Sequence, residues 1–323
     1  MGVNLGMEIS PVEVPIRREY STPFRYCYTV LVTRIRHTIP IMPTELVAAY
    51  PDSELPNCSV VAVSDSGNIP GGGQQADTIK DNMTSGTHLE RVLDALHDDV
   101  EDLDLSSSRT PAQPAISSLP EGIGRLTKLR SLNLANNDLT SLPEAIGRME
   151  NLRILNLSHN RLSALPESIG NLTVLEVLDL RSNALTMWPN PISLLANLRA
   201  LLLDHNRIPE IPKSIVHLSN LYSLLLSDNL LTELPECIGQ LAELGALNLG
   251  NNQLRILPAS IGQLANLESL DLINNRFTAL PKSLGQLKAL KLRDLRGNPL
   301  NPALQSAYNN GLHTLRTYLS NLK

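Results

Sequence analysis

Leucines and polar residues alternate along residues 129–298 in a frame that repeats every 23 residues. The units read LxxLxLxxN, as in the stretch from Leu129 to Asn137, with one departure in the last unit. The LxL step predicts a short strand whose two leucines face inward while the residue between them faces outward. A period in the twenties with this pattern predicts a solenoid, because no single coil can bury its own leucines without a neighbour.

An asparagine closes the strand of each unit and keeps the same spacing. The eight positions are Asn137, Asn160, Asn183, Asn206, Asn229, Asn252, Asn275 and Asn298. A buried side-chain amide can both donate and accept, so it can satisfy backbone groups that a turn leaves without a sheet partner. We therefore expect these side chains to form a ladder that joins consecutive coils.

Prolines with the same 23-residue spacing mark the other side of each coil. They are Pro120, Pro143, Pro166, Pro189, Pro212, Pro235, Pro258 and Pro281. Proline has no backbone N–H to satisfy and can therefore start a new segment. The Ile-Gly-x-Leu stretch that follows, for example from Ile169 to Leu172, predicts a short helical or 3-10 turn opposite the strands.

The complete unit, LxxLPxxIGxLxxLxxLxLxxN, resembles the leucine-rich repeats of the intracellular 23-residue class. That class occurs in Ras-suppressor-like proteins, plant intracellular Ras-group repeat proteins and many bacterial proteins. Residues 297–302 (GNPLNP), followed by Gly311, Leu315 and Tyr318-Leu319, are similar to its closing helix. The resemblance covers residues 100–323. It implies a right-handed α/β solenoid with a parallel concave sheet and short helical or 3-10 turns on the convex side.

The first 87 residues differ in character from the repeats. Residues 24–32 contain strand-like side chains, whereas residues 51–86 are rich in Ser, Pro, Gly and Asp. Such a composition is typical of a linker. We expect residues 1–87 to be a flexible or disordered segment; the alternative is that residues 24–32 form a small strand that docks elsewhere.

Both ends of the repeat array carry predicted caps. An amphipathic helix over residues 88–99 and the start of the first coil, up to residue 102, should shield the first coil. The repeats follow over residues 103–298, about nine coils of which the first is degenerate, and a closing helix occupies residues 299–323. In the last coil Arg293 stands where an inward leucine belongs. Either the strand shifts locally or Arg293 turns toward the end of the stack.

The composition and the terminal sequences bear on the cellular location of the protein. Of 323 residues, 42% are hydrophobic but only 3% are aromatic, an imbalance that a leucine-built solenoid explains. No run reaches the roughly 18 apolar residues of a spanning helix, and no secretory signal is evident. Three cysteines show neither pairing at the caps nor metal spacing. These features predict a cytoplasmic protein, and the net charge of −5 gives no reason to expect nucleic-acid binding.

No enzyme motif is present in the sequence. Phosphate-binding, zinc-protease and nucleophile-elbow motifs are all missing, so we expect neither catalysis nor a cofactor. His159 and His205 occupy equivalent positions beside the asparagines. They lie two coils apart, about 9–10 Å between backbones, and no third ligand is evident, which argues against a zinc site.

The concave sheet is the expected interaction surface. Apolar residues form a diagonal track across positions where the fold itself requires none: Ile154, Val177, Leu202 and Leu225. Charged and aromatic residues flank the track: Arg181, Asp204, Asp228 and Tyr222. An apolar centre with a polar rim is typical of a binding site. The alternative is that the apolar residues reflect harmless variation of the repeat.

The sequence therefore predicts a monomeric, non-enzymatic scaffold or adaptor that binds a protein on its concave face in intracellular signalling. The family resemblance implies partners such as small GTPases or phosphatases. A second hypothesis from a different class is a secreted bacterial effector. In that case residues 1–87 would direct export, and the repeats would capture a host protein in the host cytoplasm.

Overall fold

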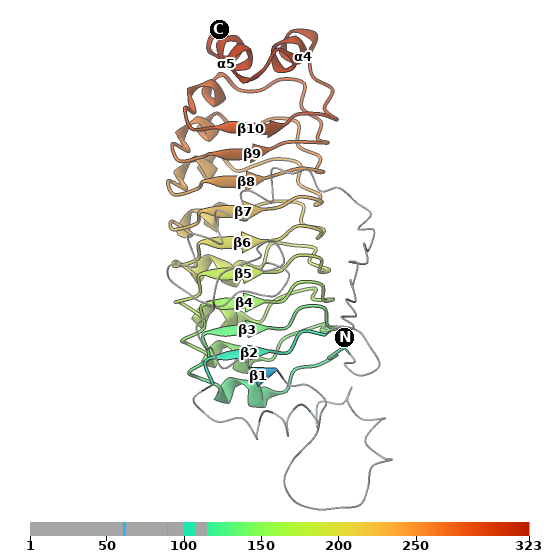
Figure 1. Ribbon diagram of the computed structural model, residues 1–323, viewed down its shortest axis with the longest axis vertical. Coiled ribbons are helices and arrows are strands. Elements are labelled where there is room, and N and C mark those ends of the chain that lie inside the picture. Colours follow the sequence, from blue (N-terminus) through green and yellow to red (C-terminus); the bar gives the residue numbers. More distant parts are fainter. Residues whose placement is uncertain (1–60, 63–88, 90–92, 94–99, 108–114, 323) are drawn as a thin grey trace, which may run out of the picture. The chain divides into compact units, whose positions relative to one another are not determined.

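The computed structural model describes residues 61–62, 89, 93, 100–107 and 115–322. Within these residues, ten parallel strands form one sheet in chain order (Figure 1). The strands are β1 (Val61–Ala62), β2 (Asp102–Asp104), β3 (Ser131–Asn133), β4 (Ile154–Asn156), β5 (Val177–Asp179), β6 (Ala200–Leu202), β7 (Ser223–Leu225), β8 (Ala246–Asn248), β9 (Ser269–Asp271) and β10 (Lys291–Asp294). From β2 to β9 each strand pairs with the next in an unbroken register, so equivalent residues of consecutive coils lie side by side.

Each coil returns through a 3-10 helix that starts directly after the proline. The helices are η1 (Glu121–Arg125), η2 (Glu144–Arg148), η3 (Glu167–Asn171), η4 (Asn190–Leu194), η5 (Lys213–His217), η6 (Glu236–Gln240), η7 (Ala259–Gln263) and η8 (Lys282–Gln286). The preceding prolines all adopt an extended conformation. Consecutive turns approach closely: a Cβ added at Gly124 would lie 2.6 Å from the carbonyl oxygen of Ala145. The predicted solenoid of parallel strands and 3-10 turns is confirmed.

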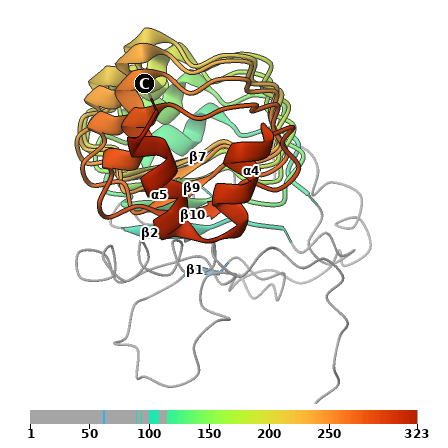
Figure 2. The same ribbon diagram turned by 90° about the horizontal axis from the view of Figure 1, so that it is seen from above.

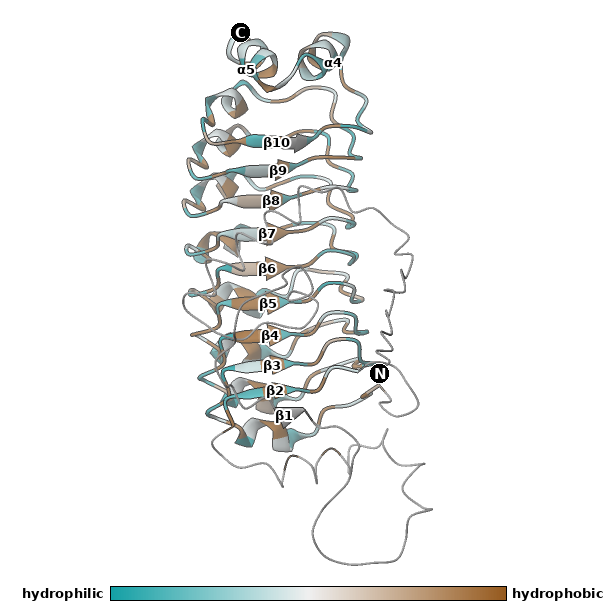
Figure 3. Ribbon diagram, in the orientation of Figure 1, coloured by the Kyte–Doolittle hydropathy of each residue, from teal (hydrophilic) through white to brown (hydrophobic). Residues whose placement is uncertain are grey.

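One continuous leucine core runs through the stack. Viewed along the stack, the strands line one side and the 3-10 helices lie along another (Figure 2). Hydrophobic positions recur at equivalent places from coil to coil (Figure 3). Both leucines of an LxL step, such as Leu201 and Leu203, are fully buried in this core. By alternation, the residue between them lies on the opposite face of the sheet, which we call the concave face.

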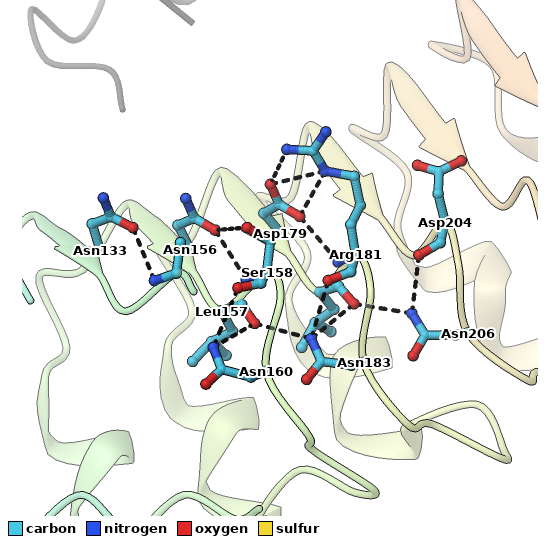
Figure 4. Close-up of polar contacts among 12 residues, drawn as sticks. Asn133, Asn156, Leu157, Ser158, Asn160, Asp179, Arg181, Asn183, Asp204 and Asn206 are labelled. Atoms are coloured by element: carbon cyan, nitrogen blue, oxygen red, sulfur yellow. Dashed lines mark hydrogen bonds and ion pairs between the residues drawn. The ribbon is translucent and has the colours of Figure 1, made fainter. Parts of the chain in front are cut away.

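The asparagines bridge neighbouring coils through their side-chain amides (Figure 4). Asn206 Nδ2 donates to the carbonyl oxygen of Leu203 in its own coil (3.0 Å) and to that of Leu180 in the preceding coil (2.9 Å). Its Oδ1 accepts a hydrogen bond from the backbone N–H of Leu185 (3.1 Å). The same three contacts recur at the interior asparagines, so each amide satisfies backbone groups of two coils.

The amino-terminal end of the sheet has an additional strand that the sequence did not predict. β1 lies within the predicted linker and pairs in parallel with β2, matching Val61 to Leu103. Of the helix predicted over residues 88–99, the structure describes Leu89 and Leu93, both helical. Leu93 is buried in the core and Leu89 packs against it. The rest of that helix, and the strand-like residues 24–32, lie outside the described residues.

The carboxyl-terminal end departs from the expected single helix. Two helices, α4 (Pro302–Asn309) and α5 (Leu312–Ser320), are separated at Gly311, whose φ of 94° ends the helical path. In β10 the register shifts between Leu292 and Asp294, so Leu292 pairs with Leu270 of β9. The first alternative for this coil is therefore correct: the strand shifts locally, as at a β-bulge.

The ladder generates a stability prediction. Asn206→Leu keeps the volume but removes every hydrogen bond of a buried rung, so we expect unfolding free energy to fall by about 1–3 kcal/mol or more. Chemical denaturation of the wild type and the variant measures the loss.

Asn171→Leu is the matched control for this substitution. Asn171 is exposed at the end of η3, and a leucine, Leu194, stands at the equivalent position of the next coil. We expect almost no change in stability. Equal losses for the two variants would contradict the assignment of Asn206 as a structural rung.

Candidate functional site

The apolar track on the concave face consists of two neighbouring pairs. Ile154 of β4 lies beside Val177 of β5, and Leu202 of β6 lies beside Leu225 of β7. The second pair is displaced by two residues along the strands, because Val177 pairs with Ala200, two residues before Leu202. Diagonal neighbours on one sheet face are about 7–8 Å apart, so the pairs form one continuous surface.

Three of the four apolar residues of the track are buried, although they lie on the concave face. Ile154, Leu202 and Leu225 retain 4%, 1% and 7% of their accessible surface, and Val177 is half-buried. None of the four belongs to the leucine core. Alternation correctly identifies the face on which a side chain lies, but it carries no information about how far that face is covered.

The middle position of each LxL step, which is the last residue of its strand, has a structural role that the sequence analysis missed. In seven coils an Asn or Asp at this position accepts a hydrogen bond, through Oδ1, from the backbone N–H two residues later, at 2.8–3.1 Å. The seven residues are Asp104, Asn133, Asn156, Asp179, Asn248, Asp271 and Asp294. We call them the Asx row. Each caps the end of its own strand.

Leu202 and Leu225 interrupt the Asx row in two adjacent coils. A leucine has no acceptor, so the N–H groups two residues later lose their usual partner. Ser227 finds another acceptor: its N–H and its hydroxyl both donate to Asp204 Oδ1, at 2.8 and 2.6 Å. The N–H of Asp204 has no acceptor among the residues that the structure describes. Leu202 thus leaves one backbone N–H without a partner among the described residues, whereas Asp204 compensates for Leu225 in the next coil.

The two arginines that follow the Asx row bind the carboxylate of their own coil. Arg181 donates to both oxygens of Asp179, through Nε at 3.0 and 3.1 Å and through Nη2 at 2.6 Å (Figure 4). Arg296 donates to both carboxylate oxygens of Asp294 in the same way. Burial alone would raise the pKa of Asp294, but the hydrogen bonds and charge of Arg296 hold it below its ordinary value.

The coil of Asp204 contains no such pair. Asp204 stands at the position that Arg181 occupies in the preceding coil, and Leu202 stands at the position of Asp179. Its carboxylate is 6% exposed and lies on the same side of the strands as that of Asp179 (Figure 4). Burial raises the pKa of Asp204, and the hydrogen bonds from Ser227 and the charges of Arg181 and His205 oppose this only in part. Ionisation of Asp204 is therefore less favourable in the folded protein than in the unfolded chain.

The residues just before the ladder asparagines share a left-handed backbone. His159, His205 and Asp228 have φ values of 55–56°. Asn, Asp and His tolerate this conformation better than other side chains, which explains the histidines structurally. His205 Nδ1 lies 3.6 Å from Asp228 Oδ2, which also accepts from Asn251. In the described part of the chain, no three His, Cys, Asp or Glu residues gather where a metal ion could bind.

Tyr222 lies at the opposite end of β7 from Asp228. It immediately precedes β7 and is half-buried. A Cβ added at Gly245, in the next coil, would collide with the Tyr222 ring. The ring therefore rests on the neighbouring glycine. The predicted flanking residues thus separate into Tyr222 where the strands begin and Arg181, Asp204 and Asp228 where they end.

The chain belongs to the leucine-rich repeat family: the family model for the leucine-rich repeat region matches residues 103–182 and 190–323. A search of curated protein sequences finds no match. The fold is that of a scaffold for protein interactions, and domains of this family are generally non-enzymatic. None of the helices among the described residues is long and apolar enough to cross a membrane.

Several solved structures are similar to this chain. The leucine-rich repeat protein LIC12759 of Leptospira interrogans is 39% identical with a TM-score of 0.63, and the match covers 67% of this chain and 54% of that one. The plant peptide hormone receptor RGFR1, in complex with RGF2, is 33% identical (TM-score 0.52; 57% and 31%). The ectodomain of the receptor kinase GASSHO1/SCHENGEN3 from Arabidopsis thaliana, in complex with CASPARIAN STRIP INTEGRITY FACTOR 2, is 36% identical (0.55; 62% and 24%). The chain thus spans 24% to 54% of the lengths of these proteins.

The raised pKa of Asp204 generates a prediction about pH. The folded protein binds this proton more tightly than the unfolded chain, so its contribution to stability is complete at low pH. That contribution is lost as pH rises from about 3.9, the ordinary Asp value, through the raised pKa. Asp204→Asn removes the titration and keeps an acceptor for Ser227. We expect the variant to melt at a higher temperature than the wild type at pH 7.

The same comparison at pH 3 provides the internal control, since both side chains are then uncharged and the advantage should disappear. Glu167→Gln, at an exposed position of η3, should change neither melting temperature. A lower melting temperature for Asp204→Asn at pH 7 would show that the Asp204 carboxylate stabilises the fold instead.

Proposed function

We propose that this chain is a scaffold or adaptor that binds a segment of a partner protein, or a peptide, on the concave face at β4–β7. The apolar track formed by Ile154, Val177, Leu202 and Leu225 is the centre of the site. Arg181, Asp204 and Asp228 lie at one edge and Tyr222 at the other. Because Ile154, Leu202 and Leu225 are almost fully buried, the partner must displace the atoms that cover them. The side chains at the centre then contribute apolar contacts, and those at the edges fix the register of the partner.

The interruption of the Asx row is the observation that carries this proposal. Asn or Asp occupies the middle position in seven described coils and accepts a backbone hydrogen bond in each. Leu202 and Leu225 forgo that bond and do not join the leucine core. Apolar residues that replace hydrogen-bond acceptors at adjacent positions on a candidate binding face are typical of functional sites. Such sites are often retained although they lower the stability of the fold.

Two of the similar structures support a peptide or an extended segment as the partner. RGFR1 and the GASSHO1/SCHENGEN3 ectodomain are both complexes, and RGFR1 is a peptide hormone receptor. The neighbouring strands lie about 4.8 Å apart, so β4–β7 together present roughly 15 Å of surface. A segment of four to five extended residues spans this distance.

The setting of this binding is part of the proposal. An adaptor in intracellular signalling, with a small GTPase or phosphatase as partner, follows from the resemblance of the repeat unit. A bacterial effector that captures a host protein is the second candidate, and the 39% identity to a Leptospira interrogans protein favours it. Fusion of residues 1–87 to a reporter in a secreting bacterium separates the two, since only the second candidate requires export.

The proposal predicts which substitution removes binding. Peptides are selected from a random display library on the full chain, and their dissociation constants are measured by fluorescence polarisation. We expect Leu202→Asn to weaken the selected peptides at least about 30-fold, equivalent to roughly 2 kcal/mol, since it removes a central apolar contact. Asn occupies the same position in three other coils and caps the strand there, so the variant should remain folded.

Asparagine is a better replacement than aspartate here, because Leu202 is almost fully buried and a charge would be buried with it. Glu167→Lys, on the exposed surface of η3, is the control and should leave affinity unchanged. Peptides that ignore Leu202→Asn but lose affinity with Glu167→Lys would place binding on the 3-10 side and contradict the proposal.

A further inference from the structure

Asp204 presents two unused hydrogen-bonding groups beside the apolar track. Its N–H has no acceptor among the described residues. Its Oδ1 accepts from Ser227, while Oδ2 has no hydrogen bond or ion pair within the described part of the chain. In the other coils the equivalent N–H points to the Asx row on the concave face. By the same register, the Asp204 N–H points toward the space that the Leu202 side chain occupies.

The positive charges nearest to Asp204 are engaged elsewhere. Arg181, in the preceding coil, forms a fork with both oxygens of Asp179. His205, the next residue, is directed to Asp228. Asp204 is therefore more than nine-tenths buried, and its carboxyl group has no cation in contact among the residues that the structure describes. A buried carboxylate of this kind gains most from a cationic hydrogen-bond donor supplied from outside.

Capping Ser227 alone does not require a charged residue at position 204. An asparagine would offer the same Oδ1 to the Ser227 N–H and hydroxyl without burying a charge, and Asn performs the capping role of the Asx row in three coils. A carboxyl group instead of an amide at position 204 therefore calls for an additional explanation. A metal ion does not provide it, since the described residues hold no cluster of three ligands.

We propose that Asp204 recognises a lysine or arginine side chain of the partner segment, whose neighbouring aliphatic residues pack on Leu202 and Leu225. This rests on the proposed function and adds the chemical class of the partner. The cationic group donates to Asp204 Oδ2.

The test uses the peptides selected on the full chain. We expect a lysine or arginine at one fixed position next to aliphatic residues. An analogue with norleucine at that position keeps the aliphatic chain and removes the charge. We expect this change to weaken binding to the wild type at least tenfold but to have almost no effect on binding to Asp204→Asn. Such coupling assigns the cation to the Asp204 carboxylate.

Asp271→Asn is the matched control. It removes a carboxylate three coils away and retains the hydrogen bond to Ile273, because Asn serves the same position in other coils. The norleucine analogue should lose as much affinity for this variant as for the wild type. The comparison of lysine and norleucine on the wild type alone remains decisive if Asp204→Asn fails to fold, because equal affinities overturn the inference.

The outcomes separate this inference from the proposed function. Peptides that depend on Leu202 but contain no basic residue, or whose basic residue contributes equally with Asp204→Asn, leave the concave site in place and refute the role of Asp204. Peptides that bind equally well to the wild type and to Leu202→Asn refute the proposed function itself.

Discussion

The buried amide of the ladder asparagine is the interaction on which every coil depends. Asn183 donates to Leu180 of its own coil and to Leu157 of the coil before it, and its oxygen accepts from the N–H of Leu162. Without the amide, the stacked coils would bury these backbone groups without partners, at a cost of about 1–3 kcal/mol for each. The leucine core and the ladder therefore form together, as expected for a stack in which each unit is stabilised by its neighbours.

Regular spacing made most of this fold predictable from the sequence. Because every unit has the same length, Asn160 and Asn183 must occupy equivalent places, and a buried turn needs the groups that an amide supplies. The ends are less regular, and prediction failed there. β1 lies in a segment that its composition marks as linker, and Gly311 breaks a helix whose apolar spacing continues across it. A glycine at this position was a signal of the break between the two helices, because glycine adopts positive φ readily and Gly311 does so here.

The candidate site was predicted as a set of positions but not as a set of contacts. Residue type shows that Asn156 and Asp179 are polar, yet it does not show that their oxygens cap the following N–H groups. Once this role is known, Leu202 is seen to remove a backbone hydrogen bond. From the sequence alone, it only replaces a polar residue by an apolar one. The exposure of these side chains could not be predicted either. A period of two assigns each side chain to a face of the sheet, but its exposure depends on the contacts it makes in the folded chain.

The ladder bonds reach no further than the adjacent coil, and they recur at a constant offset along the sequence. A gene that gains or loses one whole 23-residue unit would therefore encode a protein whose new junction is bonded like the old ones. The array can change length without redesign, and its concave face changes in steps of about 4.8 Å. Insertion of a unit between β6 and β7 would separate Leu202 from Leu225 and Asp204 from Ser227, so selection for binding at the proposed site would fix the number of coils at that junction while leaving it variable elsewhere.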